Sequence, residues 1–479
     1  MNKLNIGTSF KEKKFRYGGY AALLTGIVMA IVIAINLLVG QLNLKLDLTQ
    51  NKLFSLSEQT HSVLDGLNKE VKIIALYESG KENPTFKEIL NKYKNNSKQI
   101  VVEYSDPILY PEVAKKYSKD GKNLKIGSII IECGNKFKVI NPEDMVNYSY
   151  NSQGSQSVPE YLAIEKNITG AIMYATSQKD PVVYDLQGHD EDSLPQEIVK
   201  QMQMENYKKV DLNLLTDDLK GEEGDILLVI SPKKDLAVEE ENKIRSFLSK
   251  GGRAIFIKDL INVDTPNFDK LLYSYGVEIK KSLVVETDQQ YSAKNPIYLI
   301  PKMSNHDIVK PLNDSKINAV MPVAQPVEEA KVKKQSIKVE GLLTTSDKAF
   351  GKMNLDSKNM EKENGDINGP INVAVTVTEK LDDKNDEKDA KVIVFSSSLF
   401  LQPQIISASN GANVDLFMNS LNWLQNQKQN ISIRPKSLKM DYLKMNAFQQ
   451  MFYSGVVVII IPGIIMLAGL VVWLRRRHL

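Results

Sequence analysis

Cysteine and histidine are both scarce in this sequence. Among 479 residues there is one cysteine, Cys133, which excludes an intramolecular disulfide framework, a thiolate zinc cluster and a Cys-x-x-Cys redox pair. None of the four histidines lies in a His-Glu-x-x-His motif or an i, i+4 pair, so the sequence gives a zinc hydrolase little support. We therefore expect no metal site and no cofactor.

An excess of charge of one sign is also lacking. The 61 basic and 58 acidic residues leave a net charge of +3, which is too small a field to indicate a nucleic-acid partner. The two glycine-rich phosphate motifs, Gly-x-x-x-x-Gly-Lys-Ser/Thr and Gly-x-Gly-x-x-Gly, are absent, and so is the Gly-x-Ser-x-Gly nucleophile elbow. We expect that this chain does not hydrolyse ATP, that it has no catalytic residues, and that it is not an enzyme.

Long apolar runs are present, and they lie at the two ends of the chain. Residues 18–40 carry no charge and would form about 34 Å of helix, enough to cross a hydrocarbon core of about 30 Å. A second uncharged run lies within residues 454–474. A cleaved signal peptide is the alternative for the first run, but its apolar region usually has only about 7–15 residues. The sequence therefore predicts two transmembrane helices.

The charges that flank these runs predict their orientation, because positive flanks stay in the cytoplasm. Basic residues precede the first run and follow the second: Lys11, Lys13, Lys14 and Arg16, then Arg475, Arg476 and Arg477. Three lysines on the outer side of the second run conflict with this rule, and we expect them to meet anionic headgroups instead: Lys436, Lys439 and Lys444. The prediction is a two-pass protein of the cytoplasmic membrane, with both termini in the cytoplasm and the large domain outside.

Residues 70–145 alternate between strand and helix patterns in the order βαβαββ. This order predicts one small α/β domain, which resembles a thioredoxin-like fold. The redox motif of that fold would lie before the first helix, where residues 78–84 contain no cysteine. Cys133 ends an apolar strand and is predicted to be a small core or edge residue rather than a nucleophile.

A second α/β unit begins near residue 181, after a connection that ends in a helix around residues 163–176. Its strands are nearly continuous apolar runs that alternate with helices, which is typical of a parallel sheet covered on both faces. Residues 288–380 break this alternation and are predicted to be a β-rich insertion.

One loop of this unit is a candidate site for a small polar or charged ligand or for a partner. Gly188, His189, Asp190 and Glu191 follow the first strand and precede a helix, and Ser231 ends a later strand. Open α/β sheets bind ligands at the carboxyl ends of their strands. The alternative is a solvated acidic turn, in which glycine serves the backbone and the acids lie near a helix N-terminus.

Seven stretches of the chain follow one another in a characteristic order between the two terminal apolar runs: LDLTQNKLFSLSEQT, GHDE, DILLVISPKKDLAVEEENKIRSFLSKGGRAIFI, VEGLLTTSDKAF, VIVFSSSLFL, NVDLFMNSLNWLQNQKQNISIRPKS and IPGIIMLAGLVVWLRRR. In this order they resemble the GldG-like auxiliary proteins of bacterial ABC transport systems, a gliding-motility-associated family. The family usually has Gly-His-Gly-Glu at the second stretch, so Asp190 departs from its pattern.

The resemblance implies a thioredoxin-like domain followed by a domain similar to class I glutamine amidotransferases. The amidotransferase nucleophile would be a cysteine in the turn after a central strand, where this chain has Ser231 and Pro232. The implied role is a binding or scaffolding module that keeps the fold without its chemistry. The implied partners are a separate ABC ATPase subunit and a multi-span permease subunit.

Our leading hypothesis is a non-catalytic, membrane-anchored auxiliary subunit of an ABC-type complex, in contact with the lipid bilayer and open to an unknown extracytoplasmic ligand. One alternative is an anchored hydrolase or amidase of envelope material that uses His189, Asp190 and Glu191 as acid–base groups. The other is a purely structural envelope protein.

The predicted organisation has nine segments in chain order. They are a cytoplasmic N-terminus (1–17), the first transmembrane helix (18–40), a linker and helix (41–69), the thioredoxin-like domain (70–145), a connecting helix (146–180), the amidotransferase-like domain (181–430, insertion about 288–380), a juxtamembrane segment (431–453), the second transmembrane helix (454–474) and a cytoplasmic tail (475–479).

Overall fold

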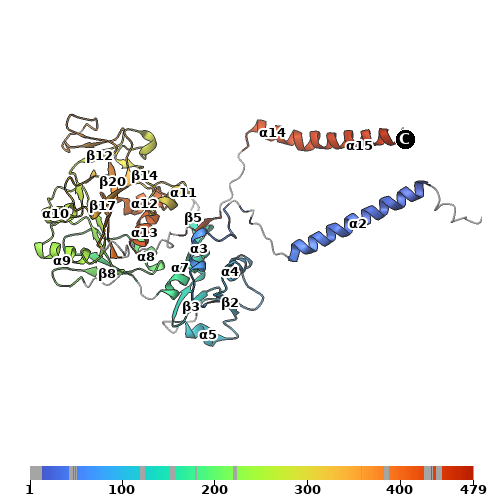
Figure 1. The fold of residues 1–479 in the computed structure, drawn as a ribbon, viewed down its shortest axis with the longest axis horizontal. Helices are drawn as coiled ribbons and strands as arrows, with labels where there is room; N and C mark the ends of the chain where they lie inside the picture. Colours follow the sequence, from blue (N-terminus) through green and yellow to red (C-terminus); the bar gives the residue numbers. More distant parts are fainter. Residues whose placement is uncertain are drawn as a thin grey trace, which may run out of the picture. The chain divides into compact units, whose positions relative to one another are not determined.

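The computed structural model gives a mixed α/β protein (Figure 1). It divides into two compact units, Met1–Ser55 and Leu56–Leu479. The residues that it describes are 13–41, 47, 49, 51–118, 124–150, 157–177, 181–219, 224–357, 359–381, 388–425, 433, 435–438 and 445–477. Of the lysines predicted to flank the apolar runs, Lys11, Lys439 and Lys444 lie outside the described residues.

The first unit contains one long helix, α2 (Lys13–Gln41), which covers the first predicted apolar run. Its apolar stretch Ala22–Leu37 is exposed along its whole length. After α2, the Asp47 carboxylate accepts the Phe54 backbone N–H at 2.7 Å and the Thr49 backbone N–H at 3.0 Å. Burial acts in the opposite direction, but these hydrogen bonds lower the pKa of Asp47 to about 2. An ionised Asp47 therefore holds the backbone at Thr49 and Phe54 in place.

The second unit begins with a lobe of residues 56–177, here the first lobe. Its four-stranded sheet has the order β2-β1-β3-β4, in which β1 and β2 are parallel and the other pairs are antiparallel. The elements of the lobe are α3 (Glu58–Asp65), β1 (Val71–Leu76), α4 (Pro84–Asn96), β2 (Ile100–Ser105), α5 (Pro111–Lys116), β3 (Ile129–Cys133), β4 (Lys136–Ile140), α6 (Pro142–Met145) and α7 (Ile164–Thr176). The predicted βαβαββ order is confirmed.

The first lobe has two unequal cores, one on each face of its sheet. Residues of α3, α4 and α7 cover one face with a large apolar cluster. The other face carries a small cluster around Tyr117, against which Leu124, Phe137 and Val139 pack while only partly buried. Cys133 is a free, buried thiol at the end of β3, in the place predicted for it.

A three-stranded sheet that local patterns did not predict adjoins α7. It contains β5 (Val146–Tyr150), β6 (Ser157–Leu162) and β22 (Lys436–Ser437) in the order β22-β6-β5. In this sheet the Lys436 ammonium lies 2.6 Å from a carboxylate oxygen of Glu165, and only 16 % of the Lys436 side chain and 4 % of the Glu165 side chain are exposed. The expectation that Lys436 meets lipid headgroups is therefore wrong, because its charge is paired inside the protein.

Residues 181–425 form the second lobe, which is built on an eight-stranded sheet of order β14-β17-β20-β21-β10-β9-β7-β8. The five strands from β21 to β8 are parallel to one another. The elements of this parallel part are β7 (Val182–Leu186), α8 (Gln196–Met204), β8 (Lys208–Leu212), β9 (Ile226–Ile230), α9 (Val238–Leu248), β10 (Arg253–Ile257), α10 (Pro266–Ser274), β21 (Ala390–Phe395), α12 (Pro403–Ala408) and α13 (Ala412–Leu424).

Both faces of this sheet are buried, which explains the continuous apolar strands. In β9, Leu228 belongs to the core under α8 and α13, whereas Leu227 and Val229 belong to the core under α9 and α10. Alternate side chains of a strand point to opposite faces, so a strand that is covered on both sides has no polar position. Figure 1 shows α9 and α10 on one side of the sheet and α8, α12 and α13 on the other. The predicted parallel sheet with two covered faces is confirmed.

The stretch predicted as an insertion is rich in short strands, but three of its strands, β14, β17 and β20, belong to the main sheet. β17 pairs antiparallel with β20, and β20 pairs antiparallel with β21, so this stretch extends the main sheet instead of standing apart from it. The elements are β11 (Val277–Ile279), β12 (Leu283–Val285), β13 (Tyr298–Leu299), β14 (Lys302–Met303), α11 (Lys310–Asp314), β15 (Met321–Pro322), β16 (Val327–Glu329), β17 (Ile337–Thr344), β18 (Phe350–Lys352), β19 (Ile367–Asn368) and β20 (Asn372–Glu379).

The chain ends in a long apolar helix, Ala447–Arg475, of which no part is buried. It consists of α14 (Ala447–Gly455), a π-helical turn (Val456–Ile460) and α15 (Ile461–Arg477). Among the described residues, this is the helix whose length and composition suffice to cross a membrane, and the apolar part of α2 is shorter.

Candidate functional site

The predicted site lies at the carboxyl edge of the parallel strands, at the point where the strand order turns. β8 lies on one side of β7 and β9 on the other, and open α/β sheets bind ligands at such a switch point. The loops after β7 and β9 are joined there, because the backbone N–H groups of Lys233 and Lys234 donate to the His189 carbonyl at 2.8 and 3.1 Å. The structure thus brings the Gly188–Glu191 loop beside the turn that contains Ser231.

His189 is buried between two carboxylates. Its Nδ1 lies 2.8 Å from Glu191 Oε1, and its Nε2 lies 2.8 Å from Glu240 Oε2 in the first turn of α9. Only 6 % of the His189 side chain is exposed. The Glu191 hydrogen bond raises the pKa of His189; burial opposes this shift, and Glu240 adds to it. The arrangement favours an imidazolium ion that bridges two carboxylates.

The rest of the loop differs in part from a solvated acidic turn. Asp190 fits that description, since its carboxylate is largely exposed and pairs with Lys234 at 2.8 Å, which lowers the pKa of Asp190. Glu191 does not fit it, because its side chain is only 1 % exposed. Although burial acts the other way, the hydrogen bond from His189 lowers the pKa of Glu191. Gly188 has a φ of 125°, a conformation that side chains rarely permit.

Ser231 begins the turn after β9 and is buried, with a left-handed φ of 49°. It lies by Asp259, which follows β10 and accepts the Ser398 hydroxyl at 2.7 Å. Burial raises the pKa of Asp259, and the hydrogen bonds from Ser398 oppose the rise. The Ser398 hydroxyl also lies 3.2 Å from the Asp192 carboxylate, so a chain of polar groups crosses the strand ends.

Sequence reasoning missed three groups at this edge: Glu240, Asp259 and Ser398. Asp259 stands two residues after the end of β10, and Ser398 stands three residues after the end of β21. A search for polar residues just after every parallel strand could have found both of them. No local pattern marks Glu240, which lies 51 residues from His189.

The polar groups of this edge are paired mainly with one another. Asp192 forms an ion pair with Lys233, and Asp259 accepts both the Ser398 backbone N–H and the Ser398 hydroxyl. In the part of the chain that the structure describes, no group of three or more His, Cys, Asp or Glu side chains is placed to hold a metal ion. Most charges at this edge are thus paired with one another, whereas the buried Ser231 hydroxyl and one carboxylate oxygen of Glu240 have no hydrogen-bond partner among the described residues. The ligand or partner site at this edge stays a prediction.

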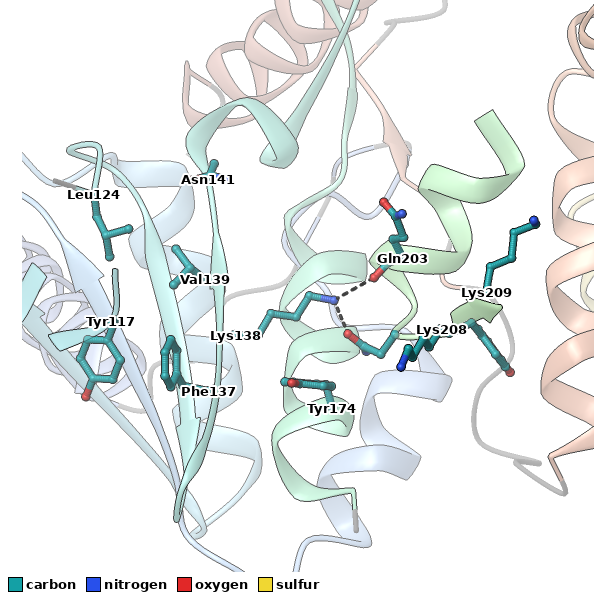
Figure 2. Close-up of a pocket in the computed structure, with 12 residues that line it drawn as sticks. Tyr117, Leu124, Phe137, Lys138, Val139, Asn141, Tyr174, Gln203, Lys208 and Lys209 are labelled. Atoms are coloured by element: carbon teal, nitrogen blue, oxygen red, sulfur yellow. Dashed lines mark hydrogen bonds between the residues drawn. The ribbon is translucent and has the colours of Figure 1, made fainter. Parts of the chain in front are cut away.

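A cavity of about 650 Å³ lies elsewhere, between the two lobes (Figure 2). The first lobe contributes side chains from the end of α5, from β4 and from α7, and the second contributes side chains from the end of α8 and from β8. The lining residues are Tyr117, Leu124, Phe137, Lys138, Val139, Asn141, Tyr174, Gln203, Asn206, Tyr207, Lys208 and Lys209.

The fold and the apolar C-terminal helix define an α/β protein suited to membrane association. Residues 180–427, more than half of the chain, match a family of auxiliary proteins described as "ABC-type uncharacterized transport system". The chain belongs to this family, which supports an auxiliary, transport-associated role. Residues 50–147 match a second family, described as a domain of unknown function.

The chain was also compared with curated proteins and with solved structures. No curated protein matches the chain. A solved structure described as "mmIFT52 N-terminal domain" is similar to 51 % of this chain and to 96 % of its own, with 15 % identity and a TM-score of 0.37. A likeness at that score carries no argument about this chain.

Proposed function

We propose that this protein is a non-catalytic, membrane-anchored auxiliary subunit of a bacterial ABC transport complex. Its ectodomain binds or scaffolds outside the membrane, beside a separate ATPase and a multi-span permease. The observation that carries the proposal is the family match over residues 180–427, joined to an apolar helix that ends the same chain. One or two spans are too few to enclose a transport pathway, so the chain needs a permease as its partner.

The spacing of aromatic residues in the C-terminal helix supports its role as an anchor. Phe452 and Tyr453 are exposed near its start, and Trp473 is exposed near its end. Tyr453 and Trp473 are 20 residues apart in sequence, which corresponds to about 30 Å of helix and equals the thickness of a hydrocarbon core. Tyrosine and tryptophan favour the two membrane–water interfaces.

We further propose that α2 is the second anchor and that both termini are cytoplasmic. The exposed apolar stretch Ala22–Leu37 of α2 supports this topology. So do the basic residues before α2 and the three arginines that end α15, since positive flanks remain inside. The region between the two helices would then lie outside the cytoplasm.

One buried carboxylate links the segments that lead to both anchors. Glu165 on α7 accepts the backbone N–H of Ser57 at 2.6 Å and the hydroxyl of Thr60 at 2.8 Å, and these residues follow α2 in sequence. The same carboxylate pairs with Lys436 at 2.6 Å, which precedes the C-terminal helix. In the proposed topology, the first lobe is therefore the part that holds both membrane connections.

The state of His189 supports a non-catalytic role over an anchored hydrolase. A general base needs a nitrogen that can reach substrate, whereas both ring nitrogens of His189 are bonded to buried carboxylates. We propose a thioredoxin-like fold for the first lobe and an amidotransferase-like fold for the second, each as a binding or scaffolding module in the manner of the GldG-like family.

Affinity capture from native membranes in mild detergent tests the proposed partners. We expect an ABC ATPase and a multi-span permease to be recovered with the tagged full-length chain. A tagged membrane protein with two unrelated spans, expressed at the same level, serves as the control. Recovery of neither subunit, or equal recovery with the control, would contradict the proposal.

A further inference from the structure

The cavity between the lobes has walls of opposite character. On the first lobe, Leu124, Phe137 and Val139 are only partly buried against the small core around Tyr117, so the cavity lies against apolar surface that this core does not cover. The rings of Tyr117 and Phe137 meet edge to face with their centroids 5.1 Å apart. The Tyr117 hydroxyl donates to Glu132 at 2.8 Å, which fixes the orientation of the Tyr117 ring.

The side of the cavity toward the second lobe is cationic and rich in amides. The twelve described residues that line the cavity include three lysines and no aspartate or glutamate. Lys138 crosses from β4 and donates to the Met204 carbonyl at 2.7 Å and to the Asn206 side-chain oxygen. These contacts hold the Lys138 ammonium group at the boundary between the two lobes.

The other two lysines of the lining come from β8. Lys209 pairs with the buried Asp185 at 2.8 Å and also with Asp211, so carboxylates offset its charge. Lys208 is exposed, and Figure 2 shows its side chain reaching from β8 toward the part of the cavity where Tyr174 lies. The Tyr174 ring also lies within 5.7 Å of the Lys138 ammonium. Lys208 thus places positive charge beside an aromatic surface.

We propose that this cavity binds an amphipathic anion, with one phosphate or comparable acidic group and a flat or chain-like apolar part. The acidic group lies by Lys208, and the apolar part packs on Phe137, Val139 and Leu124. A volume of about 650 Å³ lies within the usual range of small-molecule sites. Because the two walls belong to different lobes, the bound anion fastens the lobes together. The proposal does not depend on the proposed transport role.

Calorimetric titration of the full-length protein in phosphatidylcholine nanodiscs tests this site, with empty nanodiscs as the blank. The probe is 2-naphthyl phosphate, and the comparison compounds are inorganic phosphate, which lacks the apolar part, and 2-naphthol, which lacks the charge. We expect saturable binding of one naphthyl phosphate per chain and affinities at least about tenfold weaker for both comparison compounds, since each lacks one of the two contacts. Absence of saturable binding, or equal binding of naphthol, would overturn the proposal.

Two variants place the probe in this cavity rather than elsewhere on the protein. Lys208→Gln removes an exposed charge and is expected to weaken binding of the probe about tenfold, while Phe137→Leu weakens it less because some apolar surface remains. Lys200→Gln is the matched control, since Lys200 is an exposed lysine on α8 that does not line the cavity, and it should leave the affinity unchanged. Equal binding by the Lys208 and Lys200 variants would refute the assigned site.

Discussion

The switch-point edge and the cavity between the lobes show how differently two polar regions of one protein can be built. At the edge, His189 is bonded to two carboxylates, and Asp259 and Ser398 are bonded to each other. In the cavity, by contrast, Lys208 is exposed and Phe137 is only partly covered. The first region has the residues of an active site, most of them bonded to one another, whereas the second has open space and an ordinary sequence.

The difference teaches that residue type alone does not mark a binding site. A buried charge must be paired, since an isolated charge is costly to bury, so a histidine flanked by acids is as consistent with a structural ion cluster as with catalysis. A ligand site instead needs surface that the fold leaves uncovered. We therefore expect substitutions at the edge to lower the stability of the protein and substitutions at the cavity to leave it nearly unchanged.

The largest expected change in stability comes from removing the His189 side chain. His189→Ala leaves the Glu191 and Glu240 carboxylates buried without their shared cation, and such a change costs about 3–5 kcal/mol of unfolding free energy. Urea denaturation of the full-length chain in nanodiscs, followed by circular dichroism, measures it. Asp190→Asn in the same loop is the control and should change stability little, because the Asp190 side chain is exposed and asparagine tolerates its left-handed φ of 56°. Equal stability of the two variants would remove the contrast between edge and cavity.

A smaller loss is expected at Glu165, which belongs to a second network of paired groups. Glu165→Gln removes the charge that pairs with Lys436 and weakens the bonds to Ser57 and Thr60, at a cost of about 1–3 kcal/mol. Hydrogen exchange should become faster at Leu438, whose N–H donates to the Glu160 carbonyl beside β22. Thr85→Ser, a conservative change at a half-buried residue of α4, provides the comparison. Unchanged exchange at Leu438 would show that Glu165 does not hold this segment.

The pH dependence of the edge follows from the raised pKa of His189. A folded-state pKa above the unfolded value means that the stabilisation is fully present below the unfolded pKa, about 6.5, and is lost as the pH rises through the folded pKa. The stability difference between the wild type and His189→Gln should therefore be larger at pH 6 than at pH 9. Urea denaturation at the two pH values measures it, and a difference that grows toward pH 9 would contradict the bridging imidazolium.

The smallest expected effect is at the cavity. Lys208→Gln should change the unfolding free energy by no more than about 0.5 kcal/mol, as is usual for an exposed side chain, even though it weakens the binding of 2-naphthyl phosphate. A thermal unfolding midpoint that matches the wild type would separate binding from stability at this residue. A large loss of stability would place Lys208 among the structural charges, like those of the edge.

Much of the fold could be predicted because the residues of a strand themselves show whether the strand is buried. In β9 every residue from Ile226 to Ile230 is buried, and an unbroken apolar run is the local signature of a strand covered on both faces. The pairing of β22 with β6 could not be predicted, because β22 has two residues and its partner lies far away in sequence. The same limit applies to the candidate site. The position of the Gly188–Glu191 loop followed from the strand pattern, but the contact between His189 and Glu240 depends on tertiary packing.

Cysteine accessibility tests the proposed topology most directly. In a chain with the buried Cys133 replaced by alanine, Ser246→Cys places a single thiol on an exposed site of α9, and His478→Cys places one in the C-terminal tail. A membrane-impermeant maleimide added to right-side-out spheroplasts should label the cysteine at 246 at once and the cysteine at 478 only after permeabilisation. If the cysteine at 246 is protected until the membrane is opened, the large domain does not lie outside the cytoplasm.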